Sequence, residues 1–67
     1  MAKIQLNGKY ISLKKNISIS QLLKKYKLNE QKIAIELNRE IISKQKYNKI
    51  ILKDKDNVEI VYFIGGG

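Results

Sequence analysis

The stretch of sequence that decides the fold is residues 3–28, KIQLNGKYISLKKNISISQLLKKYKL. It opens with two short segments in which apolar and polar residues alternate, the pattern of half-buried β-strands. Asn7-Gly8 separates these segments, and both residues tolerate the positive φ angles of a tight hairpin turn. The apolar residues then change to a spacing of three and four, which is typical of an amphipathic helix. The stretch therefore predicts a β-hairpin that leads into a helix.

Two local patterns mark the start of the predicted helix. Ser18 and Gln21 have the spacing of a capping box, and Ile17 and Leu22 have that of a hydrophobic staple. We expect the helix to end near residues 28–29. Its buried face is expected to consist of Ile19, Leu22, Leu23 and Tyr26.

The chain after the helix carries three further segments of strand character, which are residues 32–37, 40–42 and 58–62. Asn38-Arg39 is suited to a turn between the first two of these segments. The polar residues 43–49 are expected to hold a single helical turn that places Tyr47 at the edge of the core. In the last strand, alternation directs Val58 and Ile60 toward the helix.

The predicted order of elements is strand, strand, helix, strand, strand, strand. This is the order of the β-grasp, or ubiquitin-like, fold. We therefore expect an α+β domain in which a mixed sheet of four to five strands packs on one main helix. The domain is expected to occupy residues 1–62, and residues 63–67 are expected to form a flexible, glycine-rich C-terminal tail. The fold resemblance also implies that the first and last strands pair.

Composition limits the chemistry that the chain can perform. Its 67 residues suffice for one small domain and leave little room for an enclosed active site. Without Cys or His, the chain has no thiolate, no imidazole base and no zinc site of the usual ligands. Its six Asp and Glu residues form no recognisable acid–base motif. We expect no catalytic residue, no metal site and no cofactor bound by this chain, and a role as substrate instead of enzyme.

The net charge of +8 is unevenly distributed. Residues 1–29 carry seven Lys and no acidic residue. Such a bias suits nucleic acid, but Arg, the usual side chain for bidentate phosphate and base recognition, occurs once. A basic nucleic-acid-binding protein is therefore a remote alternative. No apolar run reaches the roughly 20 residues that span a membrane, so we expect a soluble, cytoplasmic protein with no membrane partner.

Several segments resemble one family, the ThiS-like sulfur carriers of thiamine thiazole biosynthesis. They are AIELN at 34–38, EII at 40–42, LKD at 52–54, DNVEIV at 56–61 and FIGGG at 63–67. The conjunction of length, element order and terminal glycines is more specific than any one segment. The sequence departs from the family pattern at Arg39 and Lys55, where the family usually has glycine. These departures bear on the backbone of two turns and not on function.

The resemblance implies a carrier cycle. A ThiF-like adenylyltransferase uses MgATP to adenylate the C-terminal carboxylate of Gly67. Sulfur-donor proteins then convert the adenylate into a thiocarboxylate, and a ThiG-like thiazole synthase takes the sulfur. Gly65 and Gly66 are expected to form a thin arm that enters the partner's active site, because glycine lets backbones approach closely.

A docking surface for these partners is expected around the last strand. Side chains alternate along a strand, so Glu59 and Val61 should face away from the helix. Tyr62, Phe63 and Ile64 should crowd the exit to the tail, which is more apolar surface than a small monomer exposes without a use.

Two other functions use the same fold and tail. A molybdopterin-type sulfur carrier shares the chemistry, and a ubiquitin-like protein modifier joins its C-terminal glycine, here Gly67, to a lysine of a target protein. The ending EIVYFIGGG favours the thiamine branch over the molybdopterin branch.

Overall fold

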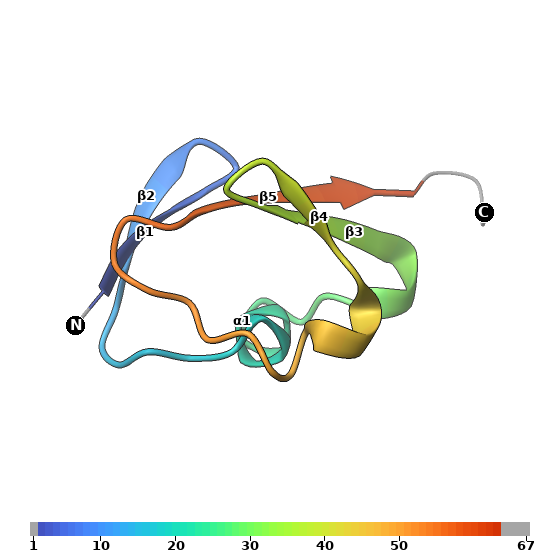
Figure 1. The fold of residues 1–67 in the computed structure, drawn as a ribbon, viewed down its shortest axis with the longest axis horizontal. Helices are drawn as coiled ribbons and strands as arrows, with labels where there is room; N and C mark the ends of the chain where they lie inside the picture. The colour runs from blue at the N-terminus through green and yellow to red at the C-terminus, as the bar shows by residue number, and fades with distance from the viewer. Residues whose placement is uncertain (1, 64–67) are drawn as a thin grey trace.

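The computed structural model describes residues 2–63. Five strands form one sheet in the order β2-β1-β5-β3-β4, and the helix α1 (Ile19–Lys25) crosses one face of it (Figure 1). The strands are β1 (Ala2–Leu6), β2 (Lys9–Leu13), β3 (Ile33–Leu37), β4 (Glu40–Ile42) and β5 (Asn57–Tyr62). Two short 3₁₀ turns complete the described elements, η1 (Glu30–Lys32) and η2 (Lys44–Lys46). The expected α+β class, with five strands and one main helix, is confirmed.

The last strand, β5, lies at the centre of the sheet. It pairs with β1 in parallel at Gln5↔Asn57 and Leu6↔Val58. On its other side it runs antiparallel to β3, from Ile33↔Tyr62 to Leu37↔Val58. The sheet is therefore mixed, and the pairing of the first and last strands that the fold resemblance implies is confirmed.

The hairpin and the start of the helix follow the sequence patterns. Asn7 and Gly8 have φ angles of 49° and 83°, so both turn residues take the left-handed conformation that the Asn-Gly pair predicts. The Ser18 backbone N–H donates to Gln21 Oε1 at 2.9 Å, and the Gln21 N–H donates to Ser18 Oγ at 3.1 Å. The capping box is therefore complete at both bonds.

The helix ends earlier than expected. It stops at Lys25, because Lys27 has a φ of 58° and turns the chain away. The Leu28 N–H then donates to the Leu23 carbonyl at 2.9 Å, which is the closing bond of a Schellman motif. Tyr26, expected on the buried face, is the C-cap residue and is 42% exposed. Both predictions, the end near residues 28–29 and the burial of Tyr26, are wrong.

The core fills the space between the sheet and α1. Its members are Ala2, Ile4, Leu13, Ile19, Leu22, Leu23, Ile33, Ile35, Tyr47, Leu52, Val58 and Ile60. The single helical turn expected over residues 43–49 is η2, and Tyr47 directly follows it. Only 1% of Tyr47 is exposed, so this side chain lies inside the core and not at its edge. Val58 and Ile60 face the helix as predicted.

Two further turns, after β3 and before β5, also hold non-glycine residues in the left-handed region. Arg39 and Lys55 have φ angles of 71° and 72°. These are the two positions at which the resembling family usually has glycine. A side chain with a Cβ is disfavoured there by roughly 1–2 kcal/mol, so both turns carry backbone strain that a glycine relieves.

Replacing Lys55 with glycine should therefore leave stability unchanged or raise it by up to about 1 kcal/mol, because relief of strain offsets the added chain entropy of the unfolded state. Lys53→Gly is the matched control. Lys53 is an exposed residue in the same loop and has no positive φ, so this change should lose about 0.5–1 kcal/mol. Urea unfolding measures both, and a clear loss in Lys55→Gly would contradict the strain.

Burial also raises the pKa of the Tyr47 hydroxyl above its ordinary value of 10.0. The folded protein then holds this proton more tightly than the unfolded chain. The stability contributed by neutral Tyr47 is complete below pH 10.0 and is lost as the pH rises through the raised pKa. As the pH rises above 10.0, the free energy of unfolding should fall more steeply in the native protein than in Tyr47→Phe. Equal slopes would contradict the burial effect.

Candidate functional site

The site is built on the central strand β5, which two asparagine side chains hold in place. On the β1 side, the pairing of residues covers only the start of β5. Asn7 extends this pairing, since its N–H donates to the Val58 carbonyl at 2.9 Å and its Oδ1 accepts from the Ile60 N–H at 2.7 Å. The hairpin turn that carries Asn7 therefore holds β5 beyond the end of β1.

The second asparagine, Asn38, holds the start of β5 from the β3–β4 turn. Its N–H donates to the Asn57 carbonyl at 2.8 Å, and its Oδ1 accepts from the Asn57 N–H at 2.9 Å. Its Nδ2 donates to Asp56 Oδ1 at 3.1 Å, while the other oxygen of that buried carboxylate accepts from the Lys53 N–H at 2.8 Å. The loop before β5 is thereby fixed to the turn beside it.

The face of the sheet opposite α1 presents a small apolar recess. Val61 is 52% exposed and lies opposite Ala34, and Ile41 on β4 is 80% exposed. Glu59, also exposed, lies opposite Glu36. The recess has a volume of about 220 Å³ and is lined by Ala34, Ile35, Glu36, Ile41 and Val61. The outward orientation expected for Glu59 and Val61 is confirmed.

The exit of β5 carries two exposed aromatic residues. Tyr62 is 53% exposed although it lies opposite Ile33 on the helix side, and Phe63 is 48% exposed. The Phe63 N–H donates to the Lys32 carbonyl at 2.9 Å. Lys44 Nζ lies 5.9 Å from the centre of the Phe63 ring, within the range of a cation–π contact. The exit is therefore held by η1 and η2.

Of the predicted site residues, the structure describes Glu59, Val61, Tyr62 and Phe63. All four are exposed, with Glu59 and Val61 on the face opposite α1 and Tyr62 on the helix side. The predicted residues Ile64, Gly65, Gly66 and Gly67 lie outside the described part of the chain. Sequence reasoning missed Ala34, Ile41, Lys32 and Lys44. The outward position of Ile41 follows from strand alternation once β4 is paired, but no local pattern predicts the contact between Lys44 and Phe63.

Within residues 2–63, no three His, Cys, Asp or Glu side chains gather as metal ligands, and no helix is long and apolar enough to cross a membrane. The chain is a ubiquitin-like β-grasp domain whose central strand leads directly to the C-terminal glycines.

Comparison with known proteins identifies the branch of this fold. The model of the ThiS family matches residues 4–67. The sulfur carrier protein ThiS of Bacillus subtilis (strain 168) is 45% identical over 65 residues, which cover 96% of this chain and 98% of that protein. The crystal structure of the thiamine biosynthesis protein ThiS from Geobacter metallireducens superposes with a TM-score of 0.83 at 29% identity, over 97% of this chain and 99% of the other. The chain belongs to the ThiS family. This membership confirms two expectations: the β-grasp fold, and a role as a carrier protein instead of an enzyme.

A longer relative contains a region similar to the whole chain. The thiazole synthase of Paramagnetospirillum magneticum is 35% identical over 65 residues. The match covers 97% of this chain but only 20% of that protein.

The two faces of β5 make a matched test of this geometry. Val58→Thr places a hydroxyl in the core and should cost about 1–3 kcal/mol. Val61→Thr makes the same exchange on the exposed face and should change stability by less than about 0.5 kcal/mol. Urea unfolding of both variants measures the difference. Similar losses in the two would show that β5 does not have one buried and one open face.

Proposed function

We propose that this chain is the sulfur carrier of thiamine thiazole synthesis and that the carboxylate of Gly67 bears the sulfur. The observation that carries the proposal is the position of β5. This strand is held at the centre of the sheet by Asn7 and Asn38, and Gly67 follows its last residue, Tyr62, by five positions in the sequence. Membership of the ThiS family supports the thiamine branch over a molybdopterin-type carrier or a protein modifier.

The proposed chemistry takes place on the terminal carboxylate while the partner enzymes supply catalysis. With an ordinary pKa of about 3.3–3.7, this group is ionised at neutral pH. One carboxylate oxygen attacks the α-phosphorus of MgATP bound to a ThiF-like adenylyltransferase, and pyrophosphate leaves. Sulfur at the oxidation level of sulfide (HS⁻), supplied by donor proteins, then attacks the acyl carbon. AMP leaves with the electron pair of the acyl C–O bond, the S–H proton passes to solvent, and a thiocarboxylate remains. This chain binds no cofactor of its own in the proposed cycle.

Docking on the adenylyltransferase is proposed to use the exit of β5 and the recess beside it. Glu59, Val61, Tyr62 and Phe63 are all exposed, with Glu59 and Val61 on the face opposite α1 and Tyr62 on the helix side. Ile64 is proposed to extend this surface, and Gly65 and Gly66 are proposed to act as a slim stalk. Residues 63–67 reach at most about 17 Å when extended, at roughly 3.3–3.6 Å per residue. That length suffices for Gly67 to enter a cleft while the domain stays outside.

A thiazole synthase is the proposed acceptor of the sulfur. In Paramagnetospirillum magneticum, a protein with that name contains a region similar to nearly all of this chain. The presence of both parts in one polypeptide supports the view that carrier and synthase act together. Since the chain's proposed partners are soluble enzymes of metabolism, the proposal places it in the cytoplasm.

Intact mass spectrometry tests the proposal. The full chain is incubated with MgATP and a ThiF-like enzyme, first alone and then with a sulfur donor. The expected products are the mass of an added AMP, followed by the mass of a carrier in which sulfur replaces one oxygen. A chain that lacks Gly67 should give neither product. No adduct on the full chain, with an enzyme that modifies Bacillus subtilis ThiS, would contradict the proposal.

The docking role of the exit is tested by Phe63→Ala. Because Phe63 is half exposed, its removal should lower affinity for the adenylyltransferase at least about tenfold and change stability by less than about 1 kcal/mol. Tyr10→Ala is the control, since Tyr10 is an exposed aromatic residue on the far edge strand β2. Calorimetry measures binding and urea unfolding measures stability. Unchanged binding with a large loss of stability would make Phe63 a core residue.

A further inference from the structure

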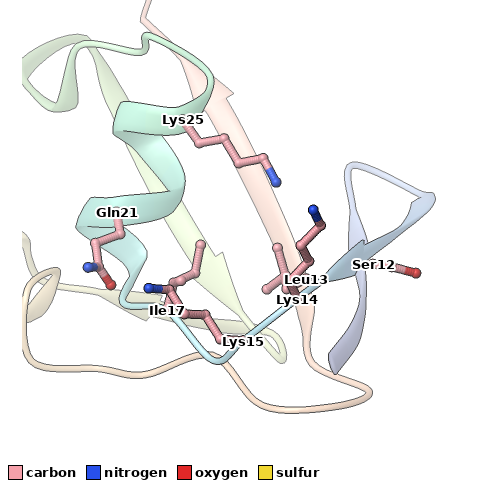
Figure 2. Close-up of a pocket in the computed structure, with 7 residues that line it drawn as sticks. All are labelled: Ser12, Leu13, Lys14, Lys15, Ile17, Gln21 and Lys25. Carbon is pink, nitrogen blue, oxygen red and sulfur yellow. The ribbon is translucent and has the colours of Figure 1, made fainter. Parts of the chain in front are cut away.

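A groove with a lysine rim lies at the other end of the domain from Phe63. It forms where the loop after β2 passes beside α1 and has a volume of about 350 Å³ (Figure 2). Its lining includes the half-buried Ile17 and the buried Leu13 beneath it, and its rim carries Lys14, Lys15 and Lys25. These five residues define what we call the lysine groove.

The positive charges of the lysine groove have no acidic neighbour in its lining. In Figure 2, the ammonium groups of Lys14 and Lys25 point toward each other although they come from different elements. No carboxylate lines the groove, and residues 1–29 contain no Asp or Glu at all. The like charges repel, and the groove therefore offers converging hydrogen-bond donors to an anionic group from outside.

Helix stability accounts for only part of this arrangement. Lys25 lies in the last turn of α1, where positive charge is favourable to the helix dipole. Lys14 and Lys15 lie in the loop before the N-cap Ser18 and are not part of α1. The favourable interaction of Lys25 with the last turn therefore does not account for these two lysines.

We propose that the lysine groove is a docking surface for an acidic segment of a protein partner. Carboxylates of the segment bind the ammonium groups of Lys14 and Lys25, and an apolar side chain between them rests on the half-buried Ile17. The apolar part of the lining favours a peptide over nucleic acid. The lining has neither the arginine fork that suits phosphate nor an aromatic ring on which a base stacks.

The location of the groove lets two partners bind at once. Leu13 pairs with Ala2 at the start of β1, whereas Phe63 follows the far end of β5, beyond the turn at Asn7 (Figure 1). A protein held in the groove therefore leaves the exit of β5 open. Such a tether keeps the carrier near a second protein at high effective concentration while the tail acts elsewhere. The inference concerns the domain surface and does not depend on the chemistry proposed for Gly67.

The test is an NMR titration of the isotope-labelled full chain with a capped Glu-Glu-Leu-Glu-Glu peptide. Saturable shifts are expected at the amides of residues 14–17, Gln21 and Lys25. Affinity should fall at least about tenfold in the double variant Lys14→Glu with Lys25→Glu, because attraction becomes repulsion. The control is Lys24→Glu with Lys27→Glu, which makes the same change in net charge outside the groove and should weaken binding less than about threefold.

Peptide variants separate the two parts of the proposed contact. A Gln-Gln-Leu-Gln-Gln peptide should not bind, and a Glu-Glu-Gly-Glu-Glu peptide should bind more weakly because Ile17 stays uncovered. Equal weakening in both double variants, shifts spread over all lysines, or no saturable binding would overturn the proposal. Tighter binding of a uridine oligonucleotide at the same amides would also overturn it and assign the groove to nucleic acid.

Discussion

The structure depends on how β5 is held between β1 and β3. Its parallel pairing with β1 is short, so the strand needs further hydrogen bonds to stay in register. Asn7 and Asn38 supply them from two turns on opposite sides of β5. Because this register is fixed, Val58 and Ile60 are buried under the helix while Glu59 and Val61 stay on the open face. A slip by one residue would exchange the two faces.

The firmly held strand β5 suits the role of a carrier protein, because the residue proposed to carry the sulfur, Gly67, follows this strand in the sequence. The chain has no Cys and no His, and its described residues gather no metal-binding cluster. The contribution proposed for it is to present the carboxylate of Gly67 to partner enzymes. Phe63 extends the held region by one residue, through its hydrogen bond to Lys32 and its contact with Lys44. Under the proposal, partner enzymes act on Gly67 without disturbing this held region.

Local patterns predicted most of the fold because each element has its own signal. Asn7-Gly8 determines the hairpin turn through the φ angles that these two residues adopt. The capping box of Ser18 and Gln21 determines the start of α1 through hydrogen bonds between residues three apart. The end of the helix escaped prediction because Lys27, which takes a positive φ, is not a residue type that indicates this conformation. The recess beside Val61, the contact of Lys44 with Phe63 and the lysine groove each join separate elements. Such sites depend on the packed fold, so periodicity along the chain does not reveal them.

The most direct measurement of the central claim follows the sulfur atom. The chain is prepared with an isotope-labelled thiocarboxylate at Gly67 and supplied to a thiazole synthase with its other substrates, and the thiazole is analysed by mass spectrometry. The account predicts that the labelled sulfur appears in the thiazole and that the carrier returns with an ordinary carboxylate. Unlabelled thiazole, or a label retained on the carrier while Bacillus subtilis ThiS delivers its sulfur in the same assay, would contradict it.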